Sequence, residues 1–134
     1  MRRALTAAVA AALVAGCGFD VSSPDLFLLT RTGQGRKLTL LVNDGGTIRC
    51  NGGRARKLSD PLLLRARDLA TNLDNDAKHN LRIPAASGSA FSYTIRLQDG
   101  TISFPDTAAA AHPELAQAEL FAVQAAQQAC RLPG

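Results

Sequence analysis

The sequence is poor in aromatic residues. Tryptophan is absent, and the 134 residues include one tyrosine and five phenylalanines. Proteins that hold single-stranded nucleic acid place aromatic side chains among basic ones, because the bases stack on the rings. We therefore do not expect nucleic acid among the partners of this chain.

Residues suited to catalysis or metal binding are also scarce. The two histidines, His79 and His112, lie in no recognisable motif, and there is no G-x-S-x-G nucleophile sequence. The stretch "DNDAKHN" (74–80) starts like a calcium loop but has Lys78 and His79 where a ligand and a glycine belong. The stretch "TGQGR" (32–36) lacks most of a phosphate loop. We predict that the chain is not an enzyme and holds neither a cofactor nor a metal.

No apolar run is long enough for a membrane-spanning helix, which needs about 20 residues. The apolar stretch "ALTAAVAAALVAG" (4–16) is free of charge and follows Arg2 and Arg3. A positive start followed by a short apolar region is typical of a signal peptide. We predict a cleaved signal peptide over residues 1–16, followed by a single folded domain over residues 26–134.

The residues that end this stretch indicate a lipid anchor. Val14, Ala15 and Gly16 precede Cys17, and this pattern resembles the lipobox of bacterial lipoproteins. The resemblance implies cleavage between Gly16 and Cys17, acyl chains on the Cys17 thiol, and a lipidated N-terminus and tether over residues 17–25. It also implies export and anchoring to the bacterial cell membrane or envelope. The alternatives are an ordinary secretory signal with a chance cysteine, or a buried apolar helix.

The other two cysteines, Cys50 and Cys130, form an even pair in a chain predicted to be exported. Such a pair is typical of a disulfide, because exported proteins fold in oxidising compartments. The alternative is two buried free thiols. Neither cysteine has a second cysteine or a histidine at the spacing of metal ligands, which argues against a metal site.

The charges are distributed unevenly along the chain. Residues 31–67 contain nine lysines and arginines against two aspartates, whereas residues 68–134 contain four against seven acids. The basic half favours an anionic partner in the envelope: lipid headgroups, an acidic polymer or an acidic protein. The alternative is an ordinary solvated surface. We expect the contact surface to combine a free sheet face with a basic loop, whose cations are Arg49, Arg54, Arg56 and Lys57.

The first half of the domain has the pattern of three strands followed by a helix. Strands are predicted over 26–32, 37–43 and 47–50, with turns between them, and "NGGRARK" (51–57) is interpreted as a loop. After Ser59 or Asp60 as a cap, a helix is predicted because four apolar residues recur on one helical face. These are Leu62, Ala66, Leu69 and Leu73.

The second half has the pattern of a hairpin followed by a helix. Apolar and polar residues alternate through "FSYTIRLQDGTISF" (91–104), and Asp99-Gly100 predicts a type I′ turn, in which both residues have positive φ. A helix is predicted from Pro113 to about Cys130. The whole pattern predicts an α+β fold: an antiparallel sheet of four to five strands with two helices packed on one face.

A second resemblance concerns the order of these elements. An opening strand that ends near "TRTGQG", a middle helix, the segment "FSYTIRLQDG" and a final helix resemble the layout of emfourin-type inhibitors of thermolysin-like metallopeptidases, over residues 26–130. The resemblance implies inhibition of a secreted metallopeptidase as an alternative function, and it assigns no inhibitory residue. The leading prediction is a small binding or structural module of the cell envelope, held at the membrane by its anchor.

Overall fold

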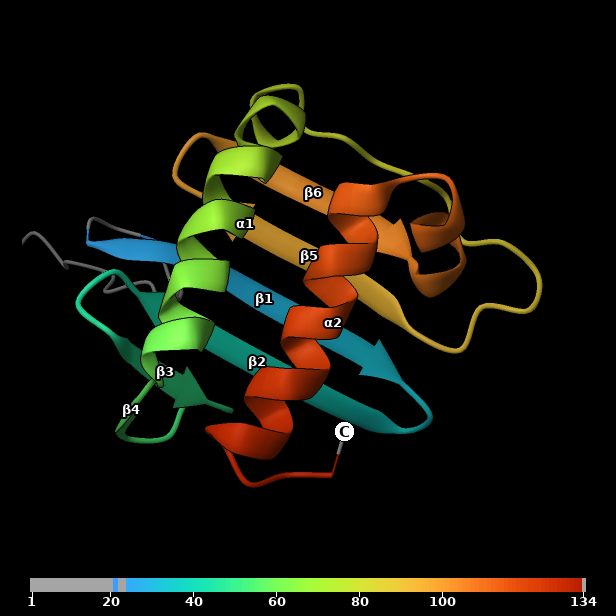
Figure 1. The fold of residues 1–134 in the computed structure, drawn as a ribbon. Coiled ribbons are helices and arrows are strands. Elements are labelled where there is room, and N and C mark those ends of the chain that lie inside the picture. The colour runs from blue at the N-terminus through green and yellow to red at the C-terminus, as the bar shows by residue number, and fades with distance from the viewer. Residues whose placement is uncertain (1–20, 22–23, 134) are drawn as a thin grey trace, which may run out of the picture.

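The computed structural model describes residue 21 and residues 24–133. They form one six-stranded antiparallel sheet in the order β4-β3-β2-β1-β5-β6, with α1 and α2 lying across it (Figure 1). The elements are β1 (Asp25–Gly33), β2 (Arg36–Asn43), β3 (Thr47–Cys50), β4 (Ala55–Lys57), α1 (Asp60–Lys78), β5 (Ser92–Leu97), β6 (Gly100–Pro105), the 3-10 helix η1 (Asp106–Ala110) and α2 (Pro113–Gln128).

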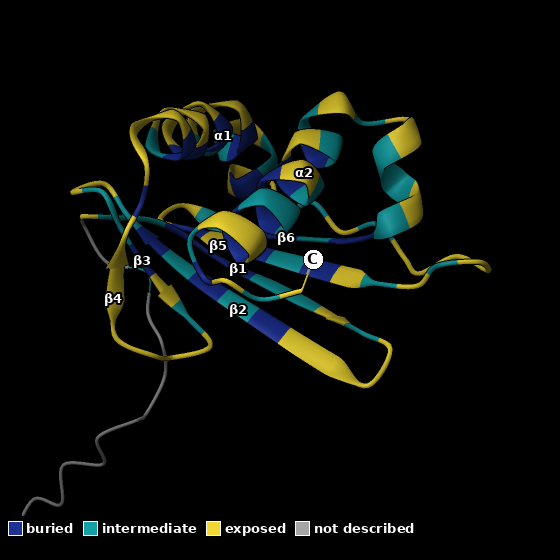
Figure 2. Ribbon diagram, turned by 60° about the horizontal axis from the view of Figure 1, so that its bottom comes forward, coloured by how far each residue is buried: buried dark blue, intermediate teal, exposed yellow. Residues whose placement is uncertain are grey.

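Both helices cover the same face of the sheet, and the core lies between the two layers (Figure 2). Strand residues that face the helices alternate with residues that face away, as in Leu38, Leu40 and Val42 of β2, which are buried. The α+β class and the one-sided helical cover are therefore confirmed. All buried residues of the core cluster lie between Phe27 and Cys130, so a chain that starts at Gly18 retains the whole core.

The sheet has one strand more than the four or five predicted. The sixth is β4, within the segment that we interpreted as a loop. Its register with β3 pairs Ile48 with Arg56, and all three β4 residues are exposed. A short, charged strand at a sheet edge has no apolar alternation to reveal it, and such edges resist pairing with other chains.

Both helices follow their predicted apolar faces. Ser59 caps α1, its hydroxyl accepting a hydrogen bond from the Leu62 N–H at 3.4 Å. The four predicted positions of α1 are buried, as are Leu115 and four alanines of α2. Alanines let α2 approach the sheet closely, and Phe121 packs edge-on against Phe27 with ring centroids 5.5 Å apart.

The turn predicted at Asp99-Gly100 is wrong in its type. Leu97 pairs with Gly100, so the two turn residues are Gln98 and Asp99, and neither they nor Gly100 has a positive φ. Gly100 is needed for another reason: a Cβ atom there would lie 1.8 Å from the Ala77 carbonyl oxygen of α1. The positive-φ pair of a two-residue hairpin occurs instead between β1 and β2, at Gln34 (φ 53°) and Gly35 (φ 70°).

The predicted disulfide between Cys50 and Cys130 is present. It joins the end of β3 to the turn after α2, with the two Cα atoms 5.9 Å apart. The bond spans 80 residues, and loops of this length restrict the unfolded chain strongly. It therefore fixes the C-terminal end of α2 over the β3 side of the sheet.

Removal of this bond is expected to lower the free energy of unfolding by about 4–5 kcal/mol, the chain-entropy value for such a loop. The measurement is denaturant unfolding of the oxidised and reduced domain, and of the double variant Cys50→Ala/Cys130→Ala. A mass measurement after thiol alkylation without reductant should find no free thiol in the domain from Gly18 onward. Alkylation of both cysteines under those conditions would contradict the assignment.

One carboxyl group of α2 is partly buried. Oε1 of Glu119 is buried and has no hydrogen-bond partner among the described residues. Burial raises the pKa of Glu119 to about 7, and the nearby charge of Asp106 adds to the effect. Burial would raise the pKa of Asp106 as well, but hydrogen bonds from Ser89 and from the N–H groups of Ala90 and Phe91 outweigh it and lower that pKa.

The domain should therefore lose stability as the pH rises from about 4.5 to about 7. The Glu119 carboxyl ordinarily titrates near 4.5 but near 7 in the fold. Between these values the folded chain binds more protons than the unfolded chain, so the free energy of unfolding falls with rising pH. Glu119→Gln should raise Tm above pH 7 and change it little near pH 4. Thermal melts of this variant and of the control Asp68→Asn, which removes an exposed carboxylate of α1, test the point, and equal pH profiles for the two variants would refute it.

Candidate functional site

The sheet face opposite the helices is lined with hydroxyl side chains along one row. The register pairs Thr30 of β1 with Thr39 of β2 and with Thr94 of β5, and it pairs Thr94 with Ser103 of β6. Paired residues in an antiparallel sheet point to the same side. Four hydroxyl groups therefore cross four adjacent strands, each half-buried in the strand burial pattern.

The neighbouring row is apolar in the middle and basic at both sides. Leu28 pairs with Leu41 and with Arg96, and Leu41 pairs with Arg49. Leu28 is only 7% exposed, yet it does not belong to the core cluster under the helices. Its neighbours Phe27 and Leu29 face the helices, so the Leu28 side chain lies on the opposite, free face of the sheet. The two arginines are exposed and flank the leucine pair.

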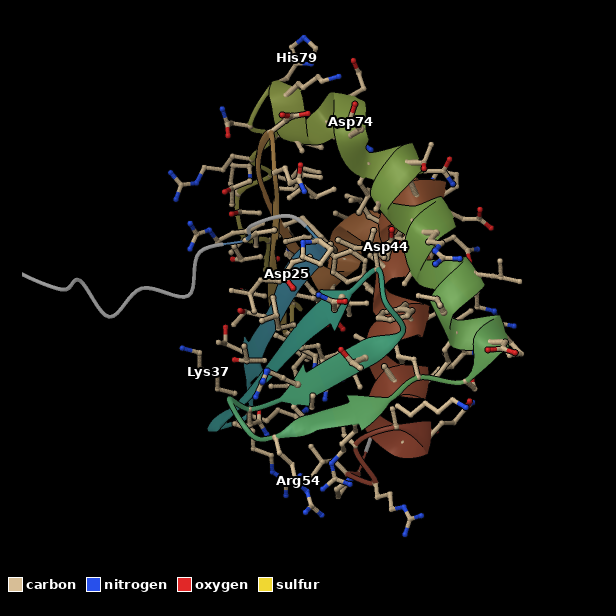
Figure 3. The ribbon with its side chains drawn as sticks, turned by 90° about the vertical axis from the view of Figure 1, so that its left-hand side faces the viewer. Asp25, Lys37, Asp44, Arg54, Asp74 and His79 are labelled. Carbon is tan, nitrogen blue, oxygen red and sulfur yellow. A yellow bond between two sulfur atoms is a disulfide. The ribbon has the colours of Figure 1, made fainter. Side chains whose placement is uncertain are left out.

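The register places five cations on this face, which we name the basic sheet face: Lys37, Arg49, Lys57, Arg82 and Arg96. Figure 3 shows Lys37 projecting from the side of the sheet that faces away from the helices. Within the described strands, the same rows contain one carboxylate, Asp25 at the start of β1, which accepts a hydrogen bond from the Asn43 amide at 3.1 Å. The face is therefore strongly positive.

Arg82 reaches this face from outside the named strands. It pairs with Ser103 in an isolated parallel bridge, in which the Ile83 N–H donates to the Ser103 carbonyl at 2.8 Å. The Ser103 N–H in turn donates to the Leu81 carbonyl at 2.9 Å. These bonds cover the open edge of β6 and present the arginine beside it.

The contact surface predicted from sequence is divided by the sheet. Arg49 and Lys57 lie on the basic sheet face, whereas Arg56 is in register with the core residue Ile48 and points to the opposite side at the edge. Arg54 precedes β4 and lies at the periphery (Figure 3). All four are exposed. The sequence prediction omitted Lys37, Arg82 and Arg96. Lys37 and Arg96 are marked in the sequence by alternation within predicted strands, whereas Arg82 joins the face only through its bridge to Ser103.

The helical layer has the opposite charge. α1 and α2 together contain six acidic residues and three basic ones. Two of the three cations are bound in ion pairs: Arg67 with Asp44 at 2.7 Å and Lys78 with Asp74 at 2.6 Å. The hydrogen bond from Lys78 holds the pKa of Asp74 below its ordinary value. The domain therefore has a positive sheet face and a negative helical face.

Gly16 and Cys17, the predicted cleavage and lipidation residues, lie outside the described residues. Among the residues that are described, no group of three or more histidines, cysteines and acids is placed to hold a metal ion. No helix in the same part of the chain is long and apolar enough to cross a membrane.

Comparisons with known protein families, with characterised proteins and with solved structures find no match for this chain. They do not bear on the resemblance to lipoproteins or to metallopeptidase inhibitors, and both stay predictions. The motif at Cys17 and the charged faces of the domain are the features of this chain that bear on function.

Proposed function

We propose that this chain is a lipid-anchored protein of the bacterial cell envelope that acts as a binding module and not as an enzyme. Its acyl chains are attached to Cys17, and its basic sheet face lies against an anionic membrane surface. The observation that supports this most directly is the separation of charge between the two layers. An anionic surface attracts the face with five cations and repels the acidic helices, so it orients the domain.

The distance between anchor and domain supports the same arrangement. Seven residues lie between Cys17 and Asp25, where β1 begins, so eight Cα–Cα steps join the two. A fully extended chain of that length spans at most about 27–29 Å. The domain therefore stays close to the bilayer surface, where the surface potential acts within about a Debye length.

The anchor itself is tested by metabolic labelling with a palmitate analogue. The full chain should incorporate the label, and Cys17→Ser should abolish it, because the thiol is the acceptor of the diacylglyceryl group in the lipoproteins that the motif resembles. Label that survives the substitution would exclude lipidation at Cys17.

The basic sheet face is tested separately with the domain from Gly18 onward, which has no anchor. This domain should bind vesicles of phosphatidylcholine with phosphatidylglycerol and should not bind phosphatidylcholine alone. The triple variant Arg49→Gln/Lys57→Gln/Arg82→Gln should bind the anionic vesicles roughly 100-fold less tightly, since each cation near such a surface contributes about 1 kcal/mol. Co-sedimentation at increasing salt measures the affinity.

A matched control removes the same charge elsewhere. Arg54→Gln/Arg56→Gln/Arg131→Gln changes three exposed cations that lie outside the basic sheet face. It should weaken vesicle binding much less. Equal losses in the two triple variants would show that total charge, and not this face, determines binding. Failure of wild type to bind anionic vesicles would remove the membrane as the partner of the face.

A further inference from the structure

A cavity of about 300 Å³ lies where the β1–β2 hairpin meets the segment before β5 and the chain after α2. It is lined by Arg31, Gln34, Arg36, Lys37, Leu38, Asn51, Phe91, Leu132 and Pro133. Three of these residues are cations and none is an acid. A site with this composition selects a negatively charged ligand.

Two of these cations, Arg31 and Arg36, are available to such a ligand. Arg36 takes part in no ion pair or side-chain hydrogen bond among the described residues and is exposed, whereas the Lys37 side chain projects to the basic sheet face. Arg31 is half-buried, with its guanidinium carbon 4.9 Å from the centroid of the Phe91 ring. Such stacking holds the guanidinium plane in place. Arg31 also forms a side-chain hydrogen bond with Tyr93, and its remaining N–H groups can donate to an oxyanion.

The opposite wall is apolar and held in position. Phe91 lies against Gly33, where a Cβ atom would be 2.7 Å from the phenyl ring and 2.2 Å from the Ala90 carbonyl oxygen. The N–H groups of Ala90 and Phe91 donate to the Asp106 carboxylate at 3.1 and 3.2 Å. Because residue 33 is a glycine, the phenyl ring can lie directly against the hairpin backbone. The two hydrogen bonds to Asp106 hold the segment that carries the ring.

The chain after α2 completes the apolar wall. The Leu132 N–H donates to the Ala126 carbonyl at 2.8 Å, which turns the chain back over the hairpin. The disulfide fixes the two sides of the cavity together, because Asn51 follows Cys50 directly and Leu132 is two residues beyond Cys130. The cavity is therefore preformed in the oxidised domain.

We propose that this cavity binds a small amphiphilic anion: one carboxylate, sulfonate or phosphate group attached to one or two small ring systems or to a short acyl chain. Arg31 and Arg36 contact the anionic group, and Phe91, Leu38 and Leu132 contact the apolar part. A volume of about 300 Å³ is at the lower end of ligand cavities. It is too small for a dinucleotide or a whole diacyl lipid. The site is separate from the basic sheet face, with which it shares Lys37 alone.

The test uses two dyes with the same ring skeleton. 8-Anilinonaphthalene-1-sulfonate carries a negative charge, and N-phenyl-1-naphthylamine is its uncharged counterpart. The oxidised domain from Gly18 onward should bind the sulfonate with one saturable site and the neutral dye at least tenfold more weakly, since hydrogen bonds to a charged group are the stronger kind. Fluorescence titration measures both affinities.

Arg36→Gln should weaken binding of the sulfonate about tenfold or more and leave the affinity for the neutral dye unchanged. Arg36 is exposed at the start of β2, so its substitution leaves the core intact, and circular dichroism melts verify the fold. Arg54→Gln, an equal change of charge outside the cavity, should have no effect. Equal affinity for the two dyes, an unaffected Arg36→Gln, or an equal loss in Arg54→Gln would each overturn the proposal.

Discussion

The burial of one sheet face under two helices is the constraint on which the rest of the structure depends. With few aromatic residues, the core is formed mainly by aliphatic strand residues and by the leucines and alanines of the helices. The alanines of α2 bring this helix close to the sheet, and the disulfide holds its C-terminal end there. Because only one face is needed for the core, the other is free to carry hydroxyl groups and cations.

Much of the fold could be predicted because the apolar spacing is strong where the elements are long. The leucines of α1 recur with the period of a helix over several turns. The apolar residues of β5 and β6 alternate with polar ones, with the period of a strand, over several residue pairs. β4 could not be predicted, since three exposed residues at an edge show no such period. The turn at Gln98 and Asp99 shows a second limit. From the sequence alone, Gly100 indicates a positive φ. The glycine is instead required because α1 approaches it closely at Ala77, and a contact between such distant parts of the chain cannot be seen in a local pattern.

The charged surface was predictable in sign but not in extent. The excess of cations in residues 31–67 is visible in the sequence. Adjacent cations of a strand point to opposite faces, however, so Arg56 and Lys57 do not share a surface although they are neighbours. Arg82 joins the face only through its bridge to Ser103. The cavity was beyond prediction, because Arg31, Phe91 and Leu132 are far apart in sequence and meet only after the sheet has formed.

The disulfide connects the cavity to the proposed location of the protein. Asn51 extends the β2 edge past β3: its N–H donates to the Thr39 carbonyl, and its side-chain oxygen accepts from the Thr39 N–H, both at 2.8 Å. Arg131 has a φ of 55°, and this left-handed conformation turns the chain after α2 toward Asn51. Each residue adjoins one cysteine, so the bond determines how the two segments meet. Under the proposed export, this bond forms in an oxidising compartment. The cavity would then be completed only after the chain has left the cytoplasm, which confines ligand binding to the envelope.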